Sequence, residues 1–244
     1  MRTKSVLTNA IAVAVALASI AITPTARADD GRCATTAAAR YGWGPPDRAD
    51  EFDDPALPGW RVYDSKGHAG NGRRTPAAVS VADGQLSIMA DPWGNSGGMA
   101  WNPGQLYGRW EVCIQSAPAA TAYHSVLLLW PDAEDWPVGG EIDFMEIWDP
   151  ARQVVEYNLH YGPDNWWEHA EIPIDATAWH SWAVEWTPEH ITAYVDGNPW
   201  WTSTDPMTFP PRPMHLCIQL DNFGGDTSSG GRQTVDWVRR YPLT

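Results

Sequence analysis

The chain has 244 residues and carries 30 acidic against 16 basic side chains, a formal net charge of −14. This charge excludes nucleic acid as a partner, because phosphate binding requires a basic surface, and it would repel an acidic polysaccharide. A neutral substrate suits it, although acidity that serves only solubility would give the same balance. Sixteen Trp residues are present. Flat indole rings suit the apolar faces of sugars, while core packing is the better interpretation of any single Trp.

Residues 1–28 are typical of a secretory signal peptide. A basic start precedes the apolar run Ile11–Ile22, and a small-x-small cleavage site ends at Ala28. A membrane anchor is the less favoured interpretation, because the apolar run is shorter than the roughly 20 residues that span a bilayer. We therefore expect a secreted protein that makes no membrane contact and begins at Asp29 after cleavage.

Residues 29–49 are predicted to be an irregular lead-in, and residues 50–244 a single all-β domain. Val79–Ala90 predicts a hairpin with Asp83-Gly84 at its turn, and Asp196-Gly197 indicates another turn. Further strands are expected at Leu106–Gln115, Ser125–Trp130, Glu141–Trp148, Val154–Tyr161, His180–Trp186, Ile191–Val195, Met214–Leu220 and Gln233–Tyr241. Many short strands between Gly and Pro predict a sandwich or barrel, and two stacked sheets with one concave face would be a jelly roll.

Three carboxylates lie within the six residues Glu141–Glu146 (EIDFME). Strand alternation puts Glu141 and Asp143 on one face and Glu146 on the other, unless a β-bulge near Phe144-Met145 returns Glu146 to their side. Crowded carboxylates cannot all ionise, and one ionised beside one protonated carboxyl is what glycosidic cleavage requires. A calcium loop is the main alternative, although the apolar residues between the acids argue against it.

At this run the sequence resembles glycoside hydrolase family 16, whose Glu-x-Asp-x-x-Glu signature stands here as EIDFMEI after the WPVGG of Trp136–Gly140. Further matches follow the family order at Asp50–Phe52, Leu106–Val112, Leu127–Pro131, Leu159–Gly162, Trp182–Gly197 and Val235–Tyr241. The resemblance covers about residues 50–241, and the bulged signature is the form of the laminarinase, agarase and carrageenase branches. It implies a concanavalin A-like β-sandwich jelly roll with an open concave cleft.

The resemblance also implies a retaining double displacement, in which Glu141 is the nucleophile, Glu146 the acid/base and Asp143 the residue that tunes both. The residues implied to contact the sugar are Trp130, Trp136, His160, Arg109 and Gln219. A buried structural role for His160, and an ion pair with an acid for Arg109, remain the alternatives. The family further implies a structural calcium ion held by Glu51 and Asp236, with no catalytic cofactor.

The resemblance implies β-1,3-glucan of the laminarin type as the neutral polysaccharide partner, with mixed-linkage β-1,3-1,4-glucan as a side activity. We expect endo action, because the cleft of the family is open, and a monomer. The alternatives are a galactan or agar hydrolase, a transglycosylase on the same scaffold, and a carbohydrate-binding jelly roll without catalysis.

Of the three cysteines, one pair is expected to be bonded in an oxidising compartment, and spacing does not choose the pair. Cys113 stands where the family has a basic residue, and QLDNFGG (Gln219–Gly225) replaces the family's Asn-Leu-Ala-x-Gly-Gly run. If the strand faces that carry Cys113 and Cys217 both look into the cleft, these two cysteines would be bonded and Cys33 would be free.

Overall fold

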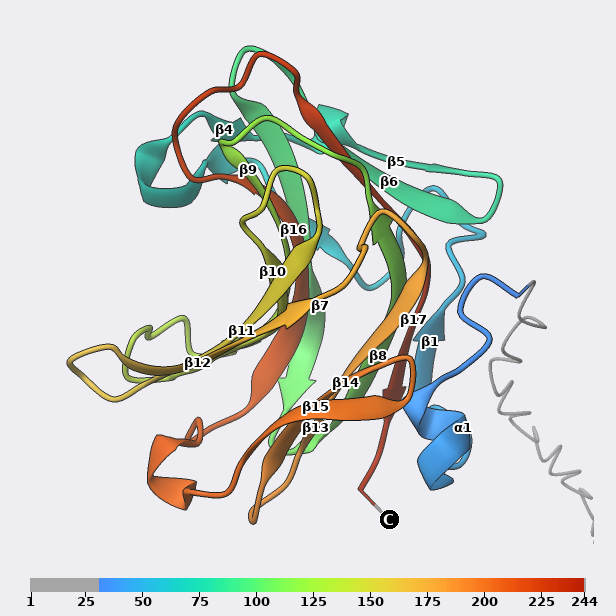
Figure 1. The fold of residues 1–244 in the computed structure, drawn as a ribbon, viewed down its shortest axis with the longest axis vertical. Coiled ribbons are helices and arrows are strands. Elements are labelled where there is room, and N and C mark those ends of the chain that lie inside the picture. The colour runs from blue at the N-terminus through green and yellow to red at the C-terminus, as the bar shows by residue number, and fades with distance from the viewer. Residues whose placement is uncertain (1–30, 244) are drawn as a thin grey trace, which may run out of the picture.

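The computed structural model describes residues 31–243, so the predicted signal peptide lies outside the described part of the chain. Two β-sheets are stacked face to face, as the fold class predicted (Figure 1). In Figure 1 both ends of one sheet, at β12 and β4, bend toward the same side and leave a concave face. We call this sheet the cleft sheet and the other the outer sheet.

The cleft sheet contains, in spatial order, β12 (Trp166–Pro173), β11 (Val154–Tyr161), β10 (Glu141–Ile147), β9 (Tyr123–Pro131), β16 (Met214–Asn222), β7 (Asn95–Gln105), β4 (Arg73–Arg74) and β3 (Ser65–Lys66), with β2 (Arg61–Val62) paired to β7. The outer sheet contains β15 (Asn198–Ser203), β14 (Ile191–Val195), β13 (His180–Trp186), β8 (Gly108–Ser116), β17 (Gly231–Tyr241), β6 (Gln85–Ala90) and β5 (Val79–Ala82), with β1 (Arg48–Asp50) paired to β17. All pairs are antiparallel except β4 with β7. Helical turns are limited to α1 (Ala37–Tyr41), η1 (His68–Gly70), η2 (Pro76–Ala78) and η3 (Pro206–Thr208) within residues 31–243.

The hydrophobic core lies between the two sheets and follows the alternation of their strands. Trp182 and Trp186 of β13 point inward from the outer sheet, and both are almost wholly buried. Leu127 and Leu129 of β9 meet them from the cleft sheet, also with no exposed surface. Burial of such side chains stabilises the sandwich by roughly 1.5–3 kcal/mol for each aliphatic one. For these Trp residues, core packing is therefore the correct interpretation.

The predicted hairpin is confirmed as β5 and β6, with Asp83 and Gly84 in the left-handed region at the turn. β7 is the longest strand that the sequence did not indicate, because its residues NSGGMAWNPGQ resemble a turn. Its glycines are required by packing: a Cβ atom on Gly98 would lie 2.8 Å from the Tyr63 ring. β12 and β15, also unpredicted, are strands at the edges of their sheets.

The predicted irregular lead-in contains two regular elements. α1 is capped at its start by Thr36, whose hydroxyl oxygen accepts a hydrogen bond from the Ala39 amide at 3.1 Å, and at its end by Gly42 in the left-handed conformation. β1 then joins the outer sheet beside β17. No helix among the described residues has the length and apolar character needed to cross a membrane.

Candidate active site

A β-bulge in β10 brings the three carboxylates of the signature to one face. Against β9, Asp143 pairs with Leu128, but Met145 already pairs with Leu127, so Phe144 is the additional residue. Phe144 and Met145 are both buried in the core. Glu146 therefore pairs with Val126 on the same face as Glu141 and Asp143, which confirms the bulge predicted from the spacing.

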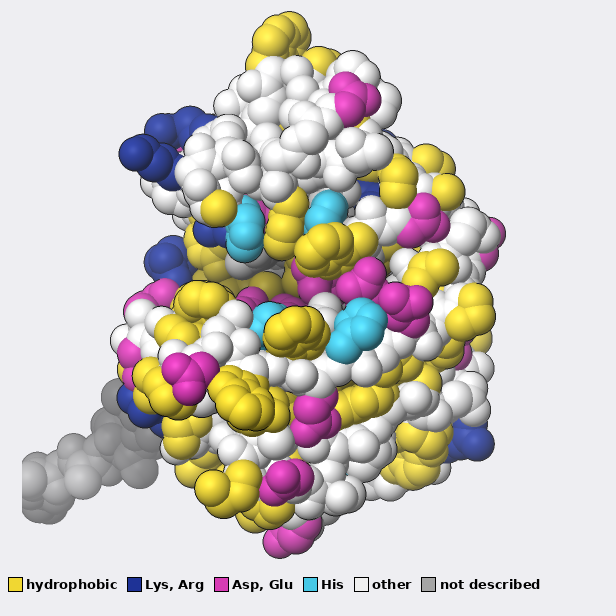
Figure 2. Space-filling view, turned by 60° about the vertical axis from the view of Figure 1, so that its left-hand side comes forward, with side chains coloured by type: hydrophobic (Ala, Val, Ile, Leu, Met, Phe, Trp, Pro, Cys, Tyr) yellow, Lys and Arg dark blue, Asp and Glu magenta, His cyan; other side chains and the backbone are white. Residues whose placement is uncertain are grey.

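This face forms the wall of a cleft of about 800 Å³. Figure 2 shows a hollow that crosses the molecule, with acidic side chains inside it and histidine and hydrophobic side chains along both of its edges. Four of the five predicted sugar contacts line the cleft, namely Trp130, Trp136, His160 and Gln219. The rings of Trp130 and Trp136 are parallel to within 9°, with 6.4 Å between their centroids. Trp136 is 42% exposed, so a flat indole is available to a sugar ring.

Burial dominates the electrostatics of Glu141 and Asp143. Loss of solvation raises the pKa of both carboxyl groups, and the negative charges of their neighbours raise them further. A hydrogen bond between the two lowers the pKa of Glu141 and raises that of Asp143, so Asp143 is the donor. Hydrogen bonding to Trp136 also favours the ionised form of Glu141. Within this pair, the hydrogen bonds favour the proton on Asp143 over Glu141.

Glu146 lies in a different environment. Burial raises its pKa to about 7, against the opposing effect of hydrogen bonds from Trp148 and Asn158. The Asn158 amide donates to Oε2 of Glu146 at 2.7 Å. Considered alone, Glu141 has a pKa of about 8, so it would take up a proton before Glu146 as the pH falls. The protons of such close carboxyls belong to the group as a whole. Because Asp143 and Trp136 both donate to Glu141, we assign the negative charge of the group to Glu141.

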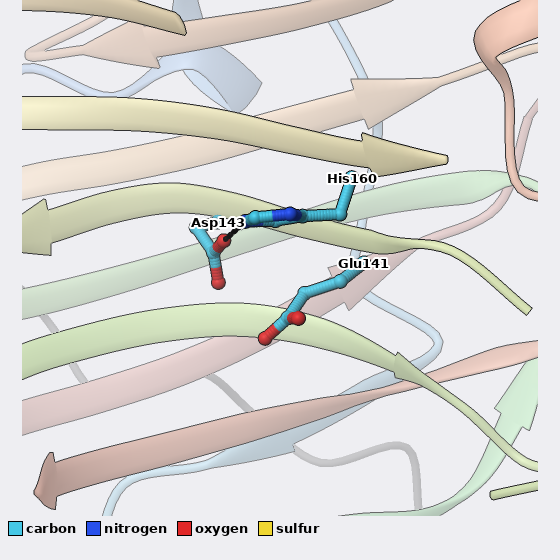
Figure 3. A group of neighbouring side chains, drawn as sticks. All are labelled: Glu141, Asp143 and His160. Atoms are coloured by element: carbon cyan, nitrogen blue, oxygen red, sulfur yellow. Dashed lines mark ion pairs between the residues drawn. The ribbon is translucent and has the colours of Figure 1, made fainter. Parts of the chain in front are cut away.

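His160 projects from β11 beside this cluster, as Figure 3 shows. Its Nε2 lies 3.7 Å from Oδ2 of Asp143, and its Nδ1 lies 3.0 Å from the side-chain oxygen of Asn165. Burial lowers the pKa of His160, so the ring is neutral near pH 7, with its proton on Nδ1 toward Asn165. Among the described residues, one group of side chains could hold a metal ion, and it consists of Glu141, Asp143 and His160. Each offers one potential ligand atom, and these atoms lie within 4.8 Å of one another.

Arg109 is not a sugar contact, contrary to the prediction. It lies on β8 of the outer sheet, away from the cleft, where its Nε donates to Glu185 Oε1 at 2.7 Å and its Nη1 to the Pro242 carbonyl at 2.7 Å. The alternative interpretation of an ion pair with an acid is the correct one. Glu185 also receives hydrogen bonds from His190 and Tyr194, so Arg109 belongs to a structural network.

Replacing Arg109 should therefore weaken the fold and spare substrate binding. We expect Arg109→Ala to lower the free energy of unfolding by about 2 kcal/mol, because Glu185 loses its charged partner while remaining largely buried. The KM for a cleaved glucan should not change. Urea denaturation and steady-state kinetics on the same preparation measure both quantities, and a raised KM with unaltered stability would contradict the assignment.

The predicted Cys113–Cys217 disulfide is wrong. Cys113 is bonded to Cys33, with 5.9 Å between their Cα atoms, and Cys217 is a buried free thiol. Cys113 lies on β8 of the outer sheet and packs with Trp237 on the side away from the core, whereas Cys217 lies on the cleft face of β16, beneath the cleft-lining Val126 and Leu128. The prediction failed because it assumed that both strand faces look into the cleft.

The expected calcium ligands are both already paired with arginine. Glu51 receives hydrogen bonds from Arg239, the shortest at 3.1 Å, and Asp236 accepts one from Arg32 at 2.6 Å. Two carboxylates that guanidinium groups neutralise do not fit a divalent cation, which needs their charge and their oxygens. The structural calcium ion stays a prediction from the resemblance. On the observed pairing we expect a chelator such as EDTA to leave the melting temperature unchanged, and a clear drop would favour the ion.

Several side chains of the cleft were not predicted. Asn158 shares a strand face with His160 on β11, and His169 and Trp167 share a face on the adjacent β12. Alternation along the predicted strand Val154–Tyr161 would have identified Asn158, two residues from His160. His169 carried no comparable signal, because β12 itself was not recognised.

An all-β sandwich that gathers three carboxylates on the wall of an open cleft suits the chemistry of a glycoside hydrolase. The family model for glycosyl hydrolases family 16 matches residues 69–239. The chain belongs to glycosyl hydrolases family 16, and the resemblance of the signature is thereby confirmed.

Individual relatives agree with this membership. A β-glucanase from Rhodothermus marinus is 27% identical over 231 residues, which cover 77% of this chain and 78% of the relative. The structure of the laminarinase from Rhodothermus marinus superposes with a TM-score of 0.70 at 24% identity, over 82% of this chain and 97% of that one. The laminarinase catalytic domain from Thermotoga maritima gives 0.70 at 20% identity, over 82% and 98%. At such identities the two structures establish the fold.

Proposed function

We propose that this glycoside hydrolase is an endo-β-1,3-glucanase that cleaves laminarin-type glucan with retention of configuration, with mixed-linkage β-1,3-1,4-glucan as a side activity. The observation that carries the proposal is the bulged β10, which holds Glu141, Asp143 and Glu146 on the wall of one open cleft. The β-glucanase relative and the laminarinase folds support the choice of glucan. A cleft open at its surface admits the middle of a chain, which favours endo action.

In the proposed mechanism, Glu141 attacks the anomeric carbon in its ionised form, which hydrogen bonds from Asp143 and Trp136 favour. Glu146 gives its proton to the departing glycosidic oxygen. A covalent glycosyl–enzyme results, and Glu146, now ionised, takes a proton from the water that releases the sugar from Glu141. Asp143 retains its own proton and donates a hydrogen bond to Glu141, which favours the ionised nucleophile.

This mechanism predicts where activity is lost at high pH. Glu146 must be protonated for the first step, and burial raises its pKa to about 7. As the pH rises through that value the acid form disappears, so kcat/KM should fall on the alkaline side from about pH 7. Initial rates on laminarin at constant ionic strength give the profile. A rate that stays level far into the alkaline range would contradict the role of Glu146.

The test of the proposed function is incubation of the purified chain with laminarin, lichenan, agarose and a β-1,4-glucan, with the products resolved by size. We expect laminarin to be cut fastest, with intermediate oligosaccharides appearing early, as endo action requires. If agarose is cut and laminarin is not, the site belongs to a galactan hydrolase. If no polysaccharide is cut but laminari-oligosaccharides bind, the cleft serves carbohydrate binding alone.

We also propose that the protein is secreted and acts as a monomer. The basic start and apolar run of residues 1–28 support export. The Cys33–Cys113 disulfide supports it independently, because such bonds persist in oxidising compartments. Size-exclusion chromatography of protein recovered from the culture medium, with the N-terminus sequenced, tests both parts.

A further inference from the structure

Glu146 has a hydrogen-bonded neighbour that is itself held by a second neighbour. Asn158 of β11, almost fully buried, donates from Nδ2 to Oε2 of Glu146 at 2.7 Å. Nδ1 of His169 on β12 lies 2.9 Å from the side-chain oxygen of Asn158. The three residues stand on three adjacent strands. We propose that Asn158 and His169 are positioning residues that determine which oxygen of Glu146 carries the catalytic proton, an inference that rests on the proposed function.

The β-bulge makes this contact geometrically available. In the ladder between β10 and β11, Asn158 stands opposite Asp143, and the residue opposite Glu146 is Glu156. Asn158 therefore reaches Glu146 diagonally, across the point where the register shifts. On its other side Asn158 stands directly opposite His169 in the regular ladder of β11 with β12. Directly opposed residues in a sheet are close enough for short side chains to bond.

The chemistry of the amide fixes the direction of each hydrogen bond. The Asn158 oxygen can only accept, so Nδ1 of His169 must carry the proton of the 2.9 Å contact. This contact prevents the amide from turning over, and its nitrogen stays directed at Glu146. A carboxyl whose Oε2 accepts an N–H bond holds its acidic proton on Oε1. In the second half of the reaction the same N–H stabilises the ionised Glu146.

Other charged groups surround Glu146 and define the background for this effect. β10 presents Glu141 and Asp143, β11 presents Glu156, and β12 presents His169, while Val126 of β9 carries no charge. His169 also lies close to two acidic residues. Its Nε2 is 3.3 Å from Oε1 of Glu171, and its Nδ1 is 3.9 Å from Oε2 of Glu156. Asn158 is an uncharged residue among these groups, and it also forms a hydrogen bond with Glu156.

The decisive variant is Asn158→Ala, assayed on two substrates. Laminarin has a poor leaving group that needs the proton of Glu146, whereas a 2,4-dinitrophenyl β-laminaribioside has a leaving group that needs none. We expect kcat/KM to fall about 10- to 100-fold on laminarin and to change little on the activated glycoside. The alkaline limb of the laminarin profile should also move to higher pH, because the ionised form of Glu146 loses a donor.

His169 is tested with a pair of variants and a matched control. His169→Ala should show the same selective loss in weaker form, and His169→Gln should recover activity, because its amide can still donate to Asn158. Glu168 is adjacent on β12, but it faces the opposite side and accepts a bond from Ser203 at 3.1 Å. Glu168→Gln should therefore leave both substrates unaffected. Equal losses on both substrates, or an alkaline limb that does not move, would overturn the proposal.

Failure of the proposed function would be visible separately, because the wild-type chain would then cut no glucan. In that case a carbon NMR titration of labelled glutamate, assigned with Glu146→Gln, measures the carboxyl of Glu146 directly. Its titration midpoint should rise in Asn158→Ala. An unchanged midpoint would overturn the role of Asn158 whatever the substrate.

Discussion

Replacing Glu141 by glutamine should abolish turnover while binding of substrate is preserved. The amide has nearly the same size and can occupy the same place beside Trp136, but it cannot attack an anomeric carbon. Loss of a covalent nucleophile removes the low-energy pathway altogether, so we expect kcat to fall by about 10⁴-fold or more. Reducing-end release from laminarin measures the rate, and calorimetric titration with laminari-oligosaccharides measures the binding.

A small anion distinguishes the nucleophile from the acid/base in the same assay. In Glu141→Gly, azide can enter the vacated space and attack the activated 2,4-dinitrophenyl glycoside directly, which gives a glycosyl azide of inverted configuration. In Glu146→Ala, the covalent intermediate still forms, and azide releases it with retained configuration. If the two products were exchanged between the variants, the roles of the two glutamates would be reversed. Substantial activity in Glu141→Gln would mean that another residue is the nucleophile.

Removing the disulfide should produce a large loss of stability. The bond joins residues 80 apart, and a cross-link of that span restricts the unfolded chain by about 4.5 kcal/mol in the chain-entropy treatment. For a domain of this size that corresponds to a fall of about 10 °C in melting temperature for the double variant Cys33→Ser, Cys113→Ser. Differential scanning calorimetry measures the change.

Cys217 supplies the control for this experiment, because it is a cysteine that forms no cross-link. Cys217→Ala should lower the melting temperature much less than the double variant. A peptide map under non-reducing conditions should recover Cys33 and Cys113 in one linked pair, with Cys217 labelled by alkylating reagents only after unfolding. A linked peptide that contains Cys217 would refute the observed pairing.

The class of fold and the carboxylate cluster were predictable from the sequence because both depend on local patterns. The alternating hairpin of Val79–Ala90 and the strands Val154–Tyr161, His180–Trp186 and Ile191–Val195 have the bounds that alternation indicated, or nearly so. The bulge was predictable because two apolar residues, Phe144 and Met145, stand between acids that must share a face. In each case the deciding information lies within a few adjacent residues.

The errors share a different cause, which is that strand parity does not say which sheet a strand belongs to. Arg109 and Cys113 share a face, but that face is the outer side of the outer sheet, so neither reaches the cleft. The strand β7 was not predicted for another reason. Its glycines allow close approach of Tyr63 and of other segments of the same chain, and a close approach between distant segments leaves no periodic signal.

The bulge of β10 has a consequence for how this strand tolerates changes in length. Deleting Met145 would shorten the run to Glu-Ile-Asp-Phe-Glu, a regular strand in which simple alternation already places all three acids on the cleft side. The deletion would remove a thioether from the core and reduce the local twist, yet no acid would change faces. Deleting Ile142 instead would reverse Glu141 relative to Asp143. The arrangement of the three acids on this strand thus tolerates the loss of Met145 but not the loss of Ile142, three positions earlier.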